Sequence, residues 1–230
     1  MHSIISYFMS GDYTSGILFL LSSLFVILCC MPVHEYAHGL VAYKLGDDTA
    51  KLQGRLTLNP FAHLNLIGSL MILLFGIGYA NPVPINPTKF RKVSMKTGMA
   101  LTALAGPVSN LLMSAISIVL SYVLIFIQYK AGATAFLEAL ITFFSYAATI
   151  NVTLAVFNLF PIPPLDGSKV LGILLPKKAY FNYLRYERYI MIVLLIVLFL
   201  GILDTPIAFI SNWLFRIMCF VPQLILEALL

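Results

Sequence analysis

Two long apolar runs constrain the fold of this chain more than any other feature of its sequence. Residues 111–127 and 190–203 contain no Asp, Glu, Lys or Arg. Only 10% of the 230 residues are charged and 60% are hydrophobic, whereas an average soluble chain is roughly 25% charged. A water-soluble fold cannot bury this much apolar sequence and keep a polar surface, so a cytosolic globular enzyme and a disordered chain are both excluded. The composition predicts an all-α polytopic membrane protein.

The order of apolar and polar stretches predicts five to six transmembrane helices, since each needs about 20 apolar residues to cross the membrane. Residues 64–79 are apolar but contain three glycines, and we interpret them as a re-entrant segment rather than a full span. Residues 49–58 alternate polar and apolar side chains, which predicts a small re-entrant β-hairpin. The predicted spans are residues 17–45, 99–128, 133–157, 189–203 and 207–230.

The basic residues predict which way the chain crosses the membrane. If residues 64–79 enter and return on one side, the Lys and Arg residues of 44–55, 89–96 and 177–188 share one face, and Lys130 lies on the other. Cytoplasmic loops carry an excess of Lys and Arg, so this face is expected to be cytoplasmic. The same rule explains the net charge of +5 without nucleic acid. The first residues lack a basic signal region, so we expect the first helix to remain as a span.

His34, Glu35 and His38 form the pattern His-Glu-x-x-His within the first predicted span. On a helix, positions i and i+4 share a face, so both imidazoles can bind one metal ion, and imidazole suits Zn²⁺. Glu35, one step round the helix, can take a proton from a water molecule at the metal. Ionisable groups inside an apolar span are costly and are therefore functional candidates. The same cluster could serve as a proton relay or an ion site in a transporter.

A catalytic zinc site normally has three protein ligands, so a third ligand must come from elsewhere in the chain. The candidates are His63, Asp47, Asp48 and Asp166. Asp47 and Asp48 follow the end of the first span and are explained as a solvated pair, and His63 as a loop histidine or a partner of a ligand. Asp166 follows three prolines in residues 158–167, which hold the backbone extended. The re-entrant topology also places Asp166 on the side of the histidines, so the sequence favours it.

Four further motifs accompany these residues in a fixed order. They are Gly-Arg-Leu-Thr-Leu-Asn-Pro-Phe-Ala-His at 54–63, Asn-Pro-Val-Pro-Ile-Asn-Pro at 81–87, Ala-Gly-Pro-Val-Ser-Asn at 105–110 and Leu-Asp-Gly at 165–167. With His-Glu-x-x-His, this ordered set resembles the site-2 protease family of intramembrane zinc metalloproteases. Each motif alone is weak, but their order is specific. The chain resembles compact members of the family that have no PDZ or CBS domain.

The resemblance implies roles for particular residues. His34, His38 and Asp166 would bind one zinc ion per chain, and Glu35 would activate water. Asn110 and Asn158 would line the site, with His63 close to it. The predicted hairpin, with Leu56 on its edge, would offer main-chain hydrogen bonds to an unwound substrate. We expect a single domain over residues 1–230, with a catalytic core at about 15–175 and C-terminal helices at 189–230.

The expected function is zinc-dependent cleavage of peptide bonds within or near transmembrane segments of other membrane proteins, as in regulated intramembrane proteolysis. Transmembrane-helix substrate proteins and the lipid bilayer are the expected partners, and nucleic acid is not. We expect a multi-pass protein of a prokaryotic plasma membrane, with the zinc site nearer the cytoplasmic face. A metal or proton transporter, or a catalytically silent binding protein, would be the alternatives. A transporter would be expected to place polar residues along a path across the membrane, whereas here they gather towards one side.

Overall fold

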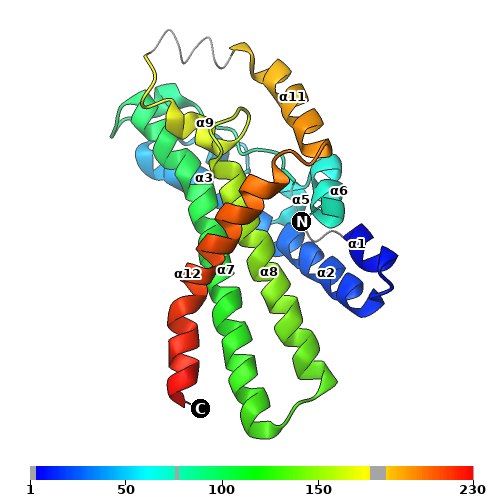
Figure 1. Cartoon of the computed structure of the whole chain (residues 1–230). Coiled ribbons are helices and arrows are strands. Elements are labelled where there is room, and N and C mark those ends of the chain that lie inside the picture. The colour runs from blue at the N-terminus through cyan, green and yellow to red at the C-terminus, as the bar shows by residue number, and fades with distance from the viewer. Residues whose placement is uncertain (1–3, 76–77, 177–184, 230) are drawn as a thin grey trace.

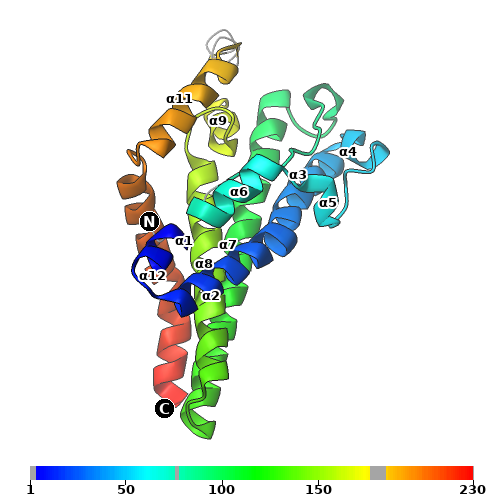
Figure 2. The same ribbon diagram turned by 90° about the vertical axis from the view of Figure 1, so that its right-hand side faces the viewer.

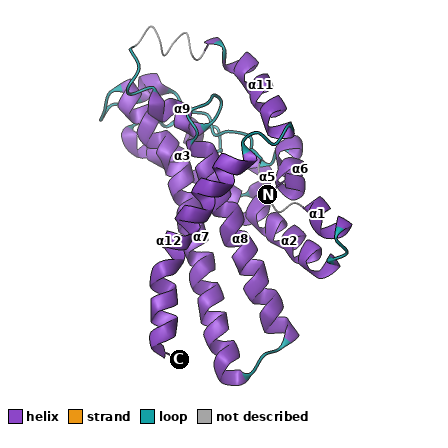
Figure 3. Cartoon of the chain, viewed as in Figure 1, coloured by secondary structure: helices purple, strands orange, loops and turns teal. Residues whose placement is uncertain are grey.

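The computed structural model describes residues 4–75, 78–176 and 185–229, and within these ranges the chain forms helices and no strands (Figure 3). In chain order the elements are α1 (Ile4–Met9), α2 (Tyr13–Phe25), the π-helical turn η1 (Val26–Cys30), α3 (Met31–Leu45), α4 (Thr49–Leu52), α5 (Pro60–His63), α6 (Leu66–Phe75), the 3₁₀ turn η2 (Pro87–Lys89), α7 (Met95–Ala131), α8 (Ala135–Leu159), α9 (Asp166–Leu171), α11 (Glu187–Phe199) and α12 (Asp204–Leu229). The prediction of an all-α protein is confirmed for the residues described.

Four helices are long and apolar enough to cross a membrane. They are Tyr13–Leu45, in which α2, η1 and α3 run on without a break, Met95–Ala131, Ala135–Leu159 and Asp204–Leu229. These candidate spans coincide with four of the predicted spans to within a few residues. The described residues do not support the higher predicted count of five to six. The 13-residue α11 and the 10-residue α6 extend for only about 20 Å and 15 Å, which is less than the roughly 30 Å of a hydrocarbon layer.

The bundle is built around the antiparallel pair α7 and α8 (Figure 1). The first long helix crosses this pair, with α3 against α7 and α2 against α8, while α12 lies along both (Figures 1 and 2). Small polar residues let the helices approach closely, and the Ser114 hydroxyl donates to the Ala148 carbonyl across the α7–α8 contact at 3.0 Å. This packing brings α3, the second half of the first long helix, next to the first part of α7.

Three segments that carry basic residues meet at one end of the bundle. The Arg91 N–H donates to the Leu45 carbonyl at 3.1 Å, and Lys89 pairs with Asp48 at 2.6 Å. The Lys96 ammonium donates to the carbonyl of Leu175, which follows α9. Lys130 lies at the other end of the 37-residue α7. The basic residues of 44–55 and 89–96 therefore gather at the end where α7 begins. Of the predicted basic segment 177–188, residues 177–184 lie outside the described residues.

The prediction of a β-hairpin at residues 49–58 was wrong. Thr49–Leu52 is the short helix α4, followed by turns. The reason lies at Asp47, which is 1% exposed rather than solvated. Its carboxylate accepts hydrogen bonds from the Thr49 backbone N–H at 3.0 Å and the Thr49 hydroxyl at 2.5 Å. A side-chain acceptor at this position satisfies a donor that a starting helix leaves free. The alternation over ten residues could not reveal this contact.

The ends of the segment between α5 and the extended residues 81–86 meet each other. The Asn81 backbone N–H donates to the His63 carbonyl at 2.8 Å, and the Asn81 amide donates to the Leu64 carbonyl at 2.7 Å. A Cβ atom at Gly68 would collide with the backbone of Tyr79, so glycine is needed for this approach. The chain thus returns to the place where α6 began. Residues 76–77, including one of its glycines, lie outside the described part.

Candidate metal centre

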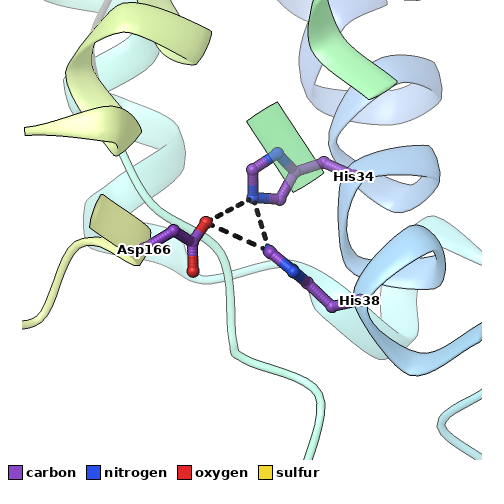
Figure 4. Close-up of side chains that lie close together, drawn as sticks. All are labelled: His34, His38 and Asp166. Carbon is purple, nitrogen blue, oxygen red and sulfur yellow. Dashed lines mark hydrogen bonds and ion pairs between the residues drawn. The ribbon is translucent and has the colours of Figure 1, made fainter. Parts of the chain in front are cut away.

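His34 and His38 lie one helical turn apart on α3, and their rings meet on the same face (Figure 4). The two Nε2 atoms are 3.0 Å apart. Both side chains are buried, at 3% and 6% exposure. Two basic nitrogen atoms so close together in a buried place repel each other if both imidazoles are protonated. A proton or a metal ion between them is needed to make the arrangement favourable.

Asp166 completes the cluster from the start of α9, more than 120 residues further along the chain (Figure 4). Its Oδ2 atom lies 3.1 Å from Nε2 of His38 and 3.5 Å from Nε2 of His34. The three donor atoms therefore form a triangle with sides of 3.0 to 3.5 Å. Ligands about 2.0–2.1 Å from a tetrahedral zinc ion lie about 3.3 Å from one another. The donor set thus fits zinc in both chemistry and spacing.

Neighbouring groups hold two of the three side chains in place. The Nδ1 atom of His38 lies 2.7 Å from the Thr102 carbonyl, which fixes the ring orientation and leaves Nε2 free to bind. The Lys169 ammonium pairs with Oδ1 of Asp166 at 3.1 Å, on the carboxylate oxygen that faces away from the histidines. Burial alone would raise the pKa of Asp166, but the nearby His38, the hydrogen bonds from both imidazoles and Lys169 hold that pKa well below its ordinary value. The carboxylate is therefore ready to act as an anionic ligand.

Gly106 of α7 gives the two histidines the room that they need. A Cβ atom at this position would collide with Nε2 of His38 and lie 2.6 Å from Cε1 of His34. The α7 backbone therefore lies directly against the rings, and only glycine fits without displacing them.

We expect Gly106→Ala to lower zinc content strongly, because the added methyl group takes the space of the His38 nitrogen that would bind the metal. Metal analysis of the purified protein would measure this loss. Ser109→Ala, one turn further along α7, is the control and should keep its zinc. A Gly106→Ala protein with full zinc content would contradict the close packing described here.

Glu35 lies beside the metal-binding triangle but is not part of it. The structure places it on the same cavity as both histidines, at 6% exposure. Its Oε2 atom accepts a hydrogen bond from the Val83 backbone N–H at 3.0 Å. Val83 belongs to the proline-rich stretch 81–87, which is extended and runs past α3. The stretch thus fixes one oxygen of Glu35 and leaves the other able to exchange a proton.

These groups open onto a cavity of about 320 Å³. Its walls come from five parts of the chain: the α3 face with the histidines, Asn65 and Met71 at α6, the returning residues 78–85, the region from the end of α8 to α9, and one side of α11. Most of the lining is apolar, including Met31, Val83, Leu165 and Leu194. A cavity with apolar walls and a few convergent polar groups is typical of an active site.

The other residues that the sequence pointed to lie in different places. Asn158 lines the cavity, and its amide donates to the Leu154 carbonyl at 3.0 Å. Asn110 is fully buried on α7, one turn after Gly106, and does not line the cavity. His63 is also buried, and its Nε2 atom lies 2.9 Å from the Thr57 carbonyl, so it holds a loop together.

Leu56 does not lie on a strand edge. Its side chain is next to Gly39 of α3, where a Cβ atom would be 3.0 Å from the leucine methyl group. Asp48 pairs with Lys89 on the surface, away from the histidines. The structure therefore brings together His34, His38 and Asp166, with Glu35 and Asn158 on the same cavity, and leaves the other candidates outside it.

Sequence reasoning did not predict the roles of Val83, Thr102, Gly106 and Lys169 at the centre. Val83 and Thr102 contribute backbone groups, and every residue type except proline can supply both of these groups. Gly106 lies in the motif at 105–110, in which only Asn110 was expected to line the site. Lys169 follows Asp166 by three residues, a spacing that places the two side chains on one helical face. That spacing was the one signal in the sequence that could have indicated the pair.

Comparison with known proteins identifies the family. The family model described as Peptidase family M50 matches residues 123–201. Over 173 residues the chain is 40% identical to "Putative zinc metalloprotease YwhC" of Bacillus subtilis (strain 168), an alignment that covers 74% of this chain and 76% of that protein. The chain belongs to peptidase family M50, the site-2 proteases.

Further M50 relatives are more distant. "Putative zinc metalloprotease Rip2" of Mycolicibacterium smegmatis is 30% identical to this chain over 145 residues. The alignment covers 61% of this chain and 52% of Rip2. "Putative zinc metalloprotease MJ0611" of Methanocaldococcus jannaschii is 30% identical over 159 residues. The alignment covers 68% of this chain and 72% of MJ0611. No solved structure gives a significant match. Family membership makes this protein an intramembrane metalloprotease, and the names of its M50 relatives give zinc as their metal.

Proposed function

We propose that this M50 peptidase binds one zinc ion at His34, His38 and Asp166 and cleaves peptide bonds within or near transmembrane segments of other membrane proteins. The observation that carries the proposal is the buried triangle of two nitrogen atoms and one oxygen atom beside Glu35, at a cavity in a membrane-spanning bundle. Three protein ligands leave a fourth position for water or substrate, as in catalytic zinc sites. When bound, zinc supplies a Lewis acid that polarises a carbonyl group and makes a nearby water molecule more acidic.

The groups around the triangle transfer the proton and orient the side chains that act in the reaction. Glu35 takes a proton from the attacking water and passes it to the nitrogen atom of the leaving amine. The Val83 N–H orients the carboxylate for this transfer at 3.0 Å. Lys169 holds Oδ1 of Asp166, so that Oδ2 faces the histidines, and adds positive charge to the cavity wall. The apolar lining excludes bulk water, which strengthens these interactions.

We assign substrate binding to the extended residues 81–86, because the hairpin predicted at residues 49–58 is absent. Asn81, Pro82, Val83 and Ile85 line the cavity, and the Val83 N–H contacts Glu35. Within the described part of the chain, the Val83 carbonyl and the Ile85 N–H have no hydrogen-bond partner. An unwound substrate can pair with such groups by strand addition, which is largely independent of its side chains. Asn158, which also lines the cavity, would contact the substrate as well.

Removal of the metal tests the function directly. We expect the purified protein to cleave a labelled transmembrane substrate in detergent or vesicles, to stop when zinc is chelated and to recover when zinc is added back. Fragment formation on a gel, with mass spectrometry of the new ends, measures this. Cleavage that continues after complete removal of metal would contradict the proposal. The transporter alternative is not favoured, because the polar cluster lies towards one end of the bundle and the family is a peptidase family.

We further propose that the protein lies in the plasma membrane of a prokaryote, with the metal centre nearer the cytoplasmic face. Lys44, Lys51, Lys89 and Lys96 lie at the end of the bundle where α7 begins, and positive charge marks the cytoplasmic side. The returning geometry of the α6 segment agrees with this placement, since it leaves residues before and after it on one face.

The proposed orientation predicts a labelling pattern. In a variant whose own cysteines are replaced, Lys51→Cys and Lys92→Cys should both react with an impermeant reagent from the cytoplasmic side, because the α6 segment does not cross. Lys130→Cys should react only from outside. Labelling of intact cells and of inverted vesicles makes the comparison. Reaction of Lys51→Cys and Lys92→Cys from opposite faces would show that the α6 segment crosses the membrane.

A further inference from the structure

The outer surface of α12 carries an arginine halfway along a candidate membrane span. Arg216 is exposed, and it lies 12 residues after Asp204 and 13 residues before Leu229, the first and last residues of the helix. At 1.5 Å per residue, about 18 to 20 Å of helix separate it from either end. Figures 1 and 2 show α12 at the edge of the bundle, so its outer side has no neighbouring helix.

A contact with α7 gives the depth of Arg216. The Tyr122 side chain of α7 and the Cys219 side chain of α12 are neighbours, which places Arg216 about one turn closer to the metal centre than Tyr122. Measured along α7, Arg216 lies about 16 Å from the level of Lys130 and about 20 Å from the level of Gly106. Both distances exceed the length of an extended arginine side chain. The guanidinium therefore cannot reach either headgroup region by snorkelling.

Nothing in the described part of the chain compensates this charge. None of the ion pairs found there includes Arg216. Next to Arg216, the side of α12 that faces the bundle consists of the apolar Leu214, Phe215 and Met218, which pack against a cluster that includes α8 residues. A guanidinium does not lose its proton in a protein. Facing lipid alone, Arg216 would be costly, and charges at this depth usually have a partner.

The side chains around Arg216 form a surface against which another transmembrane helix can pack. Trp213, Ile217 and Phe220 are 61%, 50% and 62% exposed, and together with Arg216 they line a shallow hollow on α12. Large apolar side chains around one central cation match a helix that has apolar flanks and a single carboxylate. A carboxylate is also the side chain that an arginine binds with two parallel hydrogen bonds.

We propose that this surface docks a transmembrane helix of another membrane protein that carries an Asp or Glu near its middle. A second copy of this chain in the same orientation is a poor occupant, because a two-fold axis along the membrane normal would place Arg216 against the partner copy's Arg216. Lipid headgroups do not lie at this depth. The docking surface includes no group of the metal centre, and docking does not depend on peptide cleavage.

The chain contains one tryptophan, Trp213, so the surface carries its own fluorescent reporter. The full chain is reconstituted in phosphatidylcholine vesicles and mixed with one of two synthetic Leu/Ala transmembrane peptides, each with a dansyl group near its centre. The peptides are identical except for a central Asp or Asn. Energy transfer from Trp213 to dansyl measures docking. We expect the Asp peptide to bind about tenfold more tightly than the Asn peptide, as expected for a charge-assisted pair.

Variants of Arg216 provide the controls. Arg216→Gln should remove the preference for the Asp peptide, and Arg216→Lys should retain part of it. The proposal is overturned by equal binding of the two peptides to the unaltered chain, a comparison that needs no variant. It is also overturned if the preference survives in Arg216→Gln. Self-association or phosphatidylglycerol binding that requires Arg216, without any preference for the Asp peptide, would assign the surface to a second copy or to lipid instead.

Discussion

Glu35→Gln should remove peptide-bond cleavage while leaving the metal centre intact. The amide accepts no proton from water, so the variant loses the general base. A positioned general acid or base contributes typically 10²–10⁴-fold to a rate, and we therefore expect cleavage of a transmembrane substrate to fall by about that factor. Zinc content should remain at about one per chain, since Glu35 lies outside the triangle of donor atoms. Fragment yield and metal analysis on the same preparation measure the two effects.

The side-chain amide that Glu35→Gln introduces still has an oxygen atom that can accept the hydrogen bond from the Val83 N–H, so the local fold should be retained. The matched control is Asn158→Ala, which changes another cavity wall residue without removing a proton acceptor. We expect this control to retain much more activity than Glu35→Gln. If Glu35→Gln cleaves at a rate close to that of the unaltered protein, a different group is the base and the assignment of Glu35 is wrong.

The parts of the fold that the sequence predicted are those with a strong local signal. The spans at α7 and α8 are continuous apolar runs, and their ends were predicted to within a few residues. His34 and His38 were paired correctly in space because helical spacing alone brings i and i+4 together. Asp166 was favoured as the third ligand on weaker grounds, the prolines before it and the expected topology. The structure places it within 3.5 Å of both rings.

The parts that the sequence did not predict depend on contacts between distant residues. Asp47 was interpreted as solvated, but its carboxylate is buried. It accepts hydrogen bonds from Thr49, the first residue of α4, and from the Asn86 N–H at 2.6 Å. The supposed hairpin failed for this reason. The contacts of Val83 with Glu35 and of Thr102 with His38 use main-chain atoms, so no residue pattern marks them. Tertiary contacts thus decided both the local helix and the groups that orient the site.

Substitution of Asp166 should have the largest effect on metal binding. Asp166→Ala removes the one carboxylate donor of the triangle and leaves the two imidazoles. Loss of a group that only supports a metal ligand typically costs about 10–100-fold in metal affinity. Removal of the ligand itself should cost more, so we expect zinc to fall from about one per chain to a trace after dialysis. Metal analysis and a competition titration with a zinc-binding dye measure content and affinity.

A graded set of variants makes this result specific to the proposed geometry. Lys169→Met removes the partner of Oδ1 but no donor of the triangle, so its affinity should fall by about 10–100-fold. His63→Ala should keep its zinc, because the His63 ring contacts the Thr57 carbonyl and does not line the cavity. The expected order of zinc affinity is therefore His63→Ala above Lys169→Met above Asp166→Ala. Full zinc in Asp166→Ala together with loss in His63→Ala would make His63 the third ligand. That result would require the α5 loop to move towards the histidines when metal binds.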